Sequence, residues 1–196
     1  MLILGLTGKT GAGKSTVAAF LEEKGCFVID GDVVAREIVL PGMPALNALC
    51  EAFGKDILFE DGSLDRKNLA AKAFSSAENT ARLNEITHPF IKRRFEELIE
   101  FAEKEGYRVA VIDAAALLES SCKELCEKII VVHAPEDVRL ERILKRDAIT
   151  KEQAIIRMNG QKNDDYYLGQ ADYVIRNYGD FSFENELGVI KELFYE

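Results

Sequence analysis

The chain has few of the histidines and cysteines that build zinc sites, and it lacks an apolar run long enough to cross a membrane. It contains two histidines and four cysteines in 196 residues, and no two cysteines form a C-x-x-C pair. This composition disfavours a zinc site. No apolar stretch reaches the ~18–20 residues of a membrane span, and the apolar residues 1–6 have no basic flank that would mark a signal peptide. We therefore expect a reduced, cytoplasmic protein with no membrane-embedded part.

Basic residues are also scarce relative to acidic ones. Lysine and arginine number 25 against 34 aspartates and glutamates, which gives a formal net charge of -9. Because nucleic acids are bound through clustered basic side chains, this balance argues against a nucleic-acid partner. It does not exclude a small phosphorylated substrate, since a few basic residues could gather in one pocket. No pattern indicates a protein partner, and the length and the 47% hydrophobic content fit one domain.

Short apolar runs alternate with longer amphipathic stretches along the chain. This alternation is typical of an α/β fold with a buried, mostly parallel sheet. One helix is expected over residues 15–24 and a last one over residues 181–194. The expected strands are residues 2–7, 26–30, 108–113, 128–134 and 173–177.

A long segment between the second and third expected strands, about residues 31–107, lacks strand patterns and looks helical. Within it, Ile91, Phe95 and Ala102 fall on one face of a helix that we expect to begin near Pro89. A helical insert of this size could form the wall of a substrate-binding site.

Residues 8–15, with the sequence GKTGAGKS, match the pattern G-x-x-x-x-G-K-[ST] at every constrained position. The glycines let the backbone curl so that N–H groups point at phosphate oxygens. Lys14 would supply positive charge to the β- and γ-phosphates, and Ser15 a hydroxyl to Mg²⁺. A chance match in a glycine-rich turn is the alternative, but an apolar run enters the motif and an amphipathic stretch leaves it. The predicted nucleotide-binding residues are Gly11, Ala12, Gly13, Lys14, Ser15 and Thr16.

A kinase fits this chain better than a switch GTPase, because no aspartate begins a D-x-x-G motif and N-K-x-D is absent. A large motor ATPase would need a longer chain. Asp30 and Asp32 follow the second strand, at the edge where ligands bind in open α/β sheets. Asp32 could accept the proton of an acceptor hydroxyl or hold Mg²⁺ through water; alternatively, both acids belong only to a turn. Asp113 ends a strand and is either an acid of the Mg²⁺ shell or a capping residue.

Three arginines, Arg139, Arg142 and Arg146, lie at positions i, i+3 and i+7 of a predicted helix. Arginines on one face could close over a triphosphate as a lid, about residues 139–161, and exclude water from the reaction. The alternative is a solvated helix face with exposed ion pairs to neighbouring acids. The pattern alone leaves both interpretations open.

The sequence resembles that of the dephospho-coenzyme A kinases, which phosphorylate the ribose 3′-hydroxyl of dephospho-CoA in the last step of coenzyme A synthesis. The resemblance extends from about residue 4 to residue 177 and implies a three-layer P-loop kinase fold in a single domain over residues 1–196. That fold would have a five-stranded parallel sheet, a helical substrate-binding insert and a small helical lid. The segments that carry the resemblance are GLTG at 5–8, VIDGD at 28–32, PGMPAL at 41–46, DGSLDR at 61–66, LNEITHP at 83–89 and ADYVIRN at 171–177.

The resemblance also implies ATP and Mg²⁺ as cofactors, dephospho-CoA as substrate, and roles for individual residues. Asp32 would orient or deprotonate the acceptor hydroxyl, and Asn177 would lie near the adenine of ATP. The implied catalytic residues are Asp32, Lys14, Arg142 and Arg146. The implied substrate-binding residues are Thr7, Asp32, Arg36, Asp61, Leu64, Arg66 and His88.

The chain departs from the family pattern at a few positions. Lys9 and Thr10 stand where the family more often has Gly-Ile, which adds a charge beside the phosphates, and Ala115 stands where the family has a proline. Two other functions remain open at this point: a kinase for another small molecule, such as a nucleoside monophosphate, and an ATP-binding regulator without phosphoryl transfer. Intact Lys14 and Asp32 argue against the regulator.

Overall fold

The computed structural model describes residues 1–179 and 182, and the chain forms two compact units. The first unit is Met1–Ile29 with Ile99–Glu196, and the second unit is Asp30–Leu98. The second unit contains most of the residues predicted to form a helical insert. The helix predicted over residues 181–194 falls, apart from residue 182, outside the described residues.

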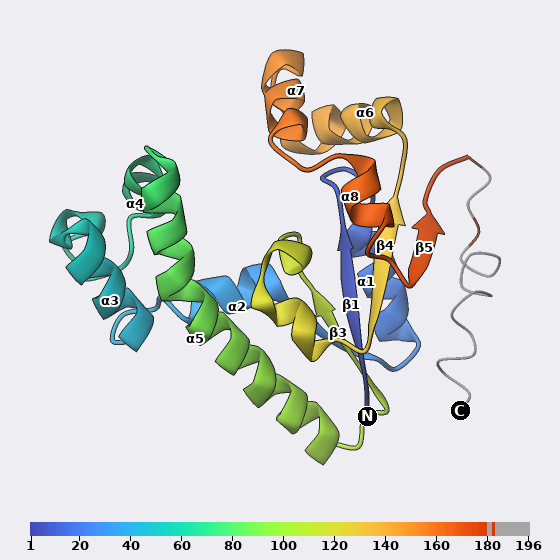
Figure 1. The fold of residues 1–196 in the computed structure, drawn as a ribbon, viewed down its shortest axis with the longest axis horizontal. Helices are drawn as coiled ribbons and strands as arrows, with labels where there is room; N and C mark the ends of the chain where they lie inside the picture. The colour runs from blue at the N-terminus through green and yellow to red at the C-terminus, as the bar shows by residue number, and fades with distance from the viewer. Residues whose placement is uncertain (180–181, 183–196) are drawn as a thin grey trace. The chain divides into compact units, whose positions relative to one another are not determined.

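The first unit is built on a five-stranded sheet with the order β2-β3-β1-β4-β5 (Figure 1). Strand β1 pairs in parallel with β3 and with β4, and β4 pairs in parallel with β5. The strands are β1 (Leu2–Gly8), β2 (Phe27–Asp30), β3 (Val109–Asp113), β4 (Lys128–His133) and β5 (Tyr173–Arg176). The prediction of an α/β fold with a five-stranded parallel sheet is confirmed.

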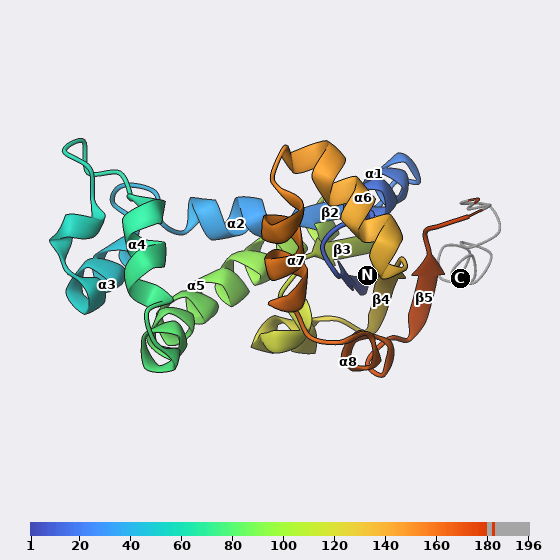
Figure 2. The same cartoon turned by 90° about the horizontal axis from the view of Figure 1, so that it is seen from above.

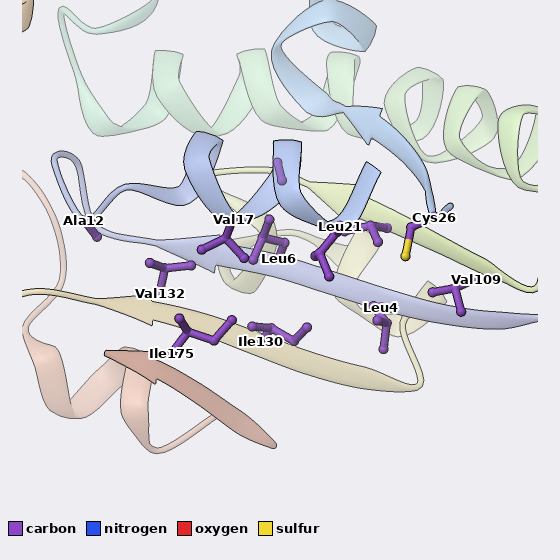
Figure 3. Close-up of a cluster of buried hydrophobic side chains, with 12 residues drawn as sticks. Leu4, Leu6, Ala12, Val17, Leu21, Cys26, Val109, Ile130, Val132 and Ile175 are labelled. Atoms are coloured by element: carbon purple, nitrogen blue, oxygen red, sulfur yellow. The ribbon is translucent and has the colours of Figure 1, made fainter. Parts of the chain in front are cut away.

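Packing between β1 and helix α1 (Lys14–Glu23) determines where the glycine-rich loop lies. Leu4 and Leu6 of β1 and Leu21 of α1 are fully buried in one apolar cluster (Figure 3). Burying a leucine side chain stabilises the fold by roughly 1.5–3 kcal/mol, so this cluster holds the strand and the helix firmly together. The loop of residues 9–13 between them is therefore fixed at both of its ends.

The predicted lid is a helical hairpin, formed by α6 (Glu136–Asp147) and α7 (Lys151–Asn159), which follow one another and meet at an angle in Figures 1 and 2. The hairpin has its own small core of Ile143, Ala154 and Met158. A capping box begins α7: the Thr150 side chain accepts from the Gln153 N–H, and the Gln153 side chain accepts from the Thr150 N–H. The other helices here are η2 (Leu117–Glu119), η3 (Ser121–Leu125) and α8 (Asp164–Leu168).

The second unit is helical, as predicted. Its helices are α2 (Gly31–Glu37), α3 (Pro44–Phe53), η1 (Lys55–Ile57), α4 (Arg66–Ala73) and most of α5 (Ala77–Lys104). Among residues 1–179 and 182, no helix combines the length and the apolar character that a membrane span requires.

Helix α5 corrects one expectation, because it begins twelve residues before Pro89 and not close to it. Proline removes one backbone hydrogen bond from a helix interior, at a cost of about 3 kcal/mol. The apolar face that was predicted does exist, since Phe95 and Ala102 are buried. Burial along this face of a 28-residue helix outweighs the local cost of the proline.

Candidate active site

The glycine-rich loop turns sharply between the end of β1 and the start of α1. Gly11 and Gly13 adopt φ angles of 80° and 92°, in the left-handed region that favours glycine. A Cβ atom on Gly13 would lie 1.9 Å from Nδ2 of Asn177, and one on Gly11 would lie 2.7 Å from the carbonyl oxygen of Arg139. Glycine is thus required at both positions for backbone conformation and for space.

The carbonyl oxygens of this loop are held by side chains from later parts of the chain. Arg142 Nη1 donates to the carbonyl oxygens of Ala12 (3.2 Å) and Gly11 (3.4 Å), and Asn177 Nδ2 donates to Ala12 (3.0 Å). The guanidinium of Arg139 donates to the carbonyl oxygen of Thr10 at 3.4 Å. These bonds engage oxygen atoms that would repel a phosphate, and they favour a loop whose N–H groups are available to an anion.

The first turn of α1 has the features of an anion site. Gly13 is its N-cap, no side chain caps it, and the first turn contains no acidic residue. The N–H groups there lack the side-chain partners that usually satisfy them, and the helix dipole adds positive potential. Ser15 and Thr16 lie in this turn and are exposed, so their hydroxyls are accessible to a ligand.

Lys14 forms a hydrogen-bonded ion pair with Asp113 beside the loop. Asp113 is the last residue of β3 and lies directly opposite Leu6 of the neighbouring strand β1. Parallel pairing therefore brings this carboxylate to the carboxyl end of the sheet, next to the loop. The structure places Asp113 near the predicted phosphate site, whereas the sequence pattern left both a capping and a metal-shell role open.

The arginines predicted to form a lid occupy three different environments. Arg139 is buried and Arg142 is half-buried, and both donate to carbonyl oxygens of the loop, whereas Arg146 lies on an exposed part of α6. Arg146 makes two bonds to Asp147, of 2.6 and 2.9 Å, and Arg157 of α7 shares the same carboxylate at 2.7 Å. The hydrogen bonds from Arg146 hold the pKa of Asp147 below its usual value. This charge cluster therefore joins the two helices of the hairpin.

The carboxylates at the end of β2 and just after it, those of Asp30 and Asp32, have different environments. Asp30 is the N-cap of α2, and its side chain accepts from the backbone N–H groups of Asp32 (2.7 Å) and Val33 (3.1 Å). The side chain of Asp32 is exposed in the first turn of the same helix. The turn interpretation thus describes Asp30, whereas the carboxylate of Asp32 faces solvent and is accessible to a ligand.

The other predicted substrate residues of the second unit lie on a turn and three helices. Asp61 accepts hydrogen bonds from the Ser63 N–H (2.9 Å) and hydroxyl (2.6 Å), which lower its pKa. Arg66 begins α4 and is exposed. Arg36 is exposed on α2, Leu64 is half-buried beside the turn, and His88 is half-buried within α5.

Thr7 of β1, also predicted to bind substrate, is fully buried in the first unit. Its hydroxyl donates to the carbonyl oxygen of Ala115 at 3.3 Å. Thr7 therefore supports the segment in which alanine replaces the family's proline.

Sequence reasoning missed two contacts between the glycine-rich loop and the segment that follows α7. Lys9 forms an ion pair with Asp164, and the Thr10 N–H donates to Oε1 of Gln161. The departures at positions 9 and 10 were the only signal, because the paired residues are more than 150 positions apart in the chain.

Comparisons with known proteins agree with this geometry. The family model described as dephospho-CoA kinase matches residues 2–182. A protein named dephospho-CoA kinase from Corynebacterium glutamicum is 45% identical over 179 residues, which cover 91% of this chain and 90% of that protein. The crystal structure of TT1252 from Thermus thermophilus is 27% identical with a TM-score of 0.82, covering 98% of this chain and 97% of that one. A dephospho-CoA kinase structure from Campylobacter jejuni is 25% identical with a TM-score of 0.60, covering 97% and 94%. The chain belongs to the dephospho-CoA kinase family.

Proposed function

We propose that this chain transfers the γ-phosphoryl group of ATP to the ribose 3′-hydroxyl of dephospho-CoA, giving coenzyme A and ADP. The observation that carries the proposal is the phosphate loop, whose carbonyl oxygens are engaged by Arg142 and Asn177 while the first turn of α1 lacks caps and acids. Such a loop is suited to a triphosphate. Family membership then supplies the identity of the acceptor.

Lys14 is the group we assign to the β- and γ-phosphates of ATP. It can exchange its bond to Asp113 for phosphate oxygens when the nucleotide binds, because both partners lie beside the loop. A cation here stabilises the charge that develops on the transferred group and on the leaving ADP.

Ser15 is the protein ligand we assign to Mg²⁺. In residues 1–179 and 182, no three His, Cys, Asp or Glu side chains gather into a metal site. This fits an ion that arrives with the triphosphate and keeps most of its phosphate and water ligands. The exposed Ser15 hydroxyl at the first turn of α1 would complete that set. When bound, Mg²⁺ neutralises charge on the β- and γ-phosphates.

Asp32 is the group we assign to the acceptor hydroxyl. In the transfer, the 3′-oxygen forms a bond to the γ-phosphorus, the bond from that phosphorus to the β–γ bridging oxygen breaks, and ADP leaves. The hydroxyl proton passes to the carboxylate of Asp32 and then to solvent. The exposed Asp32 is suited to this role, whereas the carboxylate of Asp30 is occupied by backbone N–H groups.

Arg142 and Arg146 complete the proposed catalytic set. Arg142 would shape the loop through its carbonyl contacts, and Arg146 would reach the phosphates when the hairpin approaches the nucleotide. We also propose that Asn177 lies near the adenine of ATP and that the protein is cytoplasmic. The proposed dephospho-CoA-binding residues are Thr7, Arg36, Asp61, Leu64, Arg66 and His88.

An ADP-release assay with Mg-ATP tests the proposal when it compares dephospho-CoA, AMP, adenosine and no acceptor. We expect strong stimulation by dephospho-CoA alone. Stimulation by AMP or adenosine instead would keep a kinase and reject this acceptor. Slow hydrolysis that no acceptor stimulates would indicate an ATP-binding regulator.

A further inference from the structure

The glycine-rich loop is attached to the rest of the first unit at its leading edge, before the residues that cradle phosphate. Lys9 Nζ lies 2.9 Å from Oδ1 of Asp164, and the Lys9 side chain is only 15% exposed. The next backbone N–H, that of Thr10, donates to Oε1 of Gln161 at 2.9 Å. Two consecutive residues of the loop are therefore bonded to residues three positions apart that follow α7.

Asp164 also pairs with the last residue of the strand that precedes the α6–α7 hairpin. It is the first residue of α8, which follows the hairpin, and its Oδ2 lies 3.5 Å from Nε2 of His133, the last residue of β4, which precedes it. The ring of Tyr178 packs edge-on against the His133 ring, with centroids 6.0 Å apart. One carboxylate thus contacts Lys9 of the loop and His133 at the end of β4, the strand that precedes the hairpin.

The ionisation of Asp164 agrees with this arrangement. Burial raises the pKa of its carboxyl, but the hydrogen bond and charge of Lys9, together with His133, outweigh burial and leave the pKa lowered. The carboxylate is therefore charged at neutral pH, as an ion pair with Lys9 requires.

We propose that Lys9, Gln161 and Asp164, here named the loop anchor, are positioning residues that hold the phosphate loop in its nucleotide-binding shape before ATP arrives. The proposal rests on the assignment of this loop to ATP. A glycine-rich backbone loses conformational freedom when it closes around phosphates, and contacts that are already formed reduce that cost. Loss of the anchor should weaken ATP binding and leave the chemical step nearly unchanged, because no anchor residue is assigned to the reacting atoms.

A direct contact between Lys9 and the phosphates is the competing explanation, and two substitutions separate the two. If Lys9 acts through the anchor, Lys9→Met and Asp164→Asn weaken ATP binding alike, because each breaks the same pair. If Lys9 acts on the phosphates, Asp164→Asn frees the lysine and strengthens ATP binding. The double variant adds a second criterion, since the effects of residues that act only through each other are not additive.

Calorimetric titration with Mg-ATP is the test, because it requires no acceptor. We expect a Kd about twofold to fivefold higher in Lys9→Met and in Asp164→Asn, the range expected of a partly exposed ion pair, and no further loss in the double variant. In the ADP-release assay, KM for ATP should rise by the same factor and kcat should stay within about twofold. Unchanged Kd in both variants, or tighter binding by Asp164→Asn, would overturn the anchor.

Two matched controls remove a charge without touching the anchor. Asp165→Asn removes an exposed acid from the same first turn of α8, and Lys104→Met removes a lysine whose side chain is 76% exposed at the end of α5. Both should bind Mg-ATP like the unmodified chain. If Lys9→Met or Asp164→Asn does not fold, Gln161→Ala tests the anchor without removing a charge, and we expect the same rise in Kd for Mg-ATP. If the anchor variants bind Mg-ATP more weakly as expected but the unmodified chain does not phosphorylate dephospho-CoA, the proposed function is refuted and the anchor stands.

Discussion

The side-chain amide of Asn177 donates a hydrogen bond of 3.0 Å to the carbonyl oxygen of Ala12, across 165 positions of the chain. Asn177 directly follows β5, and its side chain is buried against Gly13 at the mouth of the phosphate loop. A residue next to the edge strand β5 therefore helps to hold the phosphate loop, which follows the central strand β1. Asn177 can shape the phosphate site as well as lie near a base.

Replacing Asn177 by alanine distinguishes these two roles. If Asn177 mainly holds the Ala12 carbonyl, the variant should have a higher Kd for Mg-ATP and for Mg-GTP. Both values should rise by the same factor, roughly threefold to tenfold for one lost hydrogen bond. If Asn177 mainly contacts adenine, only the affinity for ATP should fall. Calorimetric titration with both nucleotides gives the ratio that decides, and we expect that ratio to stay close to its original value.

Replacing Gly13 by alanine should damage the loop more than backbone strain alone can explain. Gly13 and Gly25 have similar φ angles of 92° and 87°, but an added Cβ meets Asn177 at Gly13 and nothing within 4 Å at Gly25. Gly25→Ala therefore measures the conformational cost, roughly 1 kcal/mol. Urea unfolding should show a larger loss for Gly13→Ala, together with loss of Mg-ATP binding. Equal losses in both variants, with ATP binding intact, would contradict the close approach of Asn177.

Asp32→Asn should keep ATP binding and lower turnover of dephospho-CoA by a factor on the order of 10² or more, as loss of a general base does. The matched control is Asp30→Asn, because asparagine caps a helix about as well as aspartate and the N-cap of α2 should survive. Steady-state rates of both variants provide the comparison. Near-normal turnover in Asp32→Asn, or an equal loss in Asp30→Asn, would remove the role given to Asp32.

Two cysteines should resist alkylation in the folded protein. Burial raises the pKa of Cys26 to about 11, and burial with a smaller contribution from Cys122 raises the pKa of Cys126 to about 12. At pH 8 a thiol with a pKa of 12 is ionised to about one part in ten thousand, and only the thiolate is nucleophilic. Mass spectrometry after brief iodoacetamide treatment should find both unmodified in the native chain and modified in urea. Cys126 is half-buried, and rapid native labelling of it would contradict the raised pKa.

The sheet and the phosphate loop could be predicted from the sequence because their signals are local. Continuous apolar runs mark buried parallel strands, and the spacing of residues 8–15 specifies the loop. The start of α5 was misplaced near Pro89, because local rules place proline at a helix start whereas burial of Phe95 and Ala102 favours a continuous helix. Tertiary packing there overrides the local preference.

The detailed contacts of the site could not be predicted, because they join residues far apart in the chain. Nothing local pairs Lys9 with Asp164 or Asn177 with Ala12. The capping role of Asp30, which leaves Asp32 as the exposed carboxylate, could have been predicted, since Asp is a preferred N-cap and Asp30 directly precedes α2. The roles of Asp61, Leu64 and the other substrate residues stay predictions, since they depend on a bound acceptor.

The most direct test of the central claim is identification of the product. Purified chain incubated with Mg-ATP and dephospho-CoA should give coenzyme A, recognised by ³¹P NMR as a new phosphomonoester on the ribose 3′-oxygen, with one ADP formed for each coenzyme A. The Lys14→Ala variant should give neither product. ADP without a 3′-phosphomonoester, or a phosphate on another acceptor only, would contradict the claim.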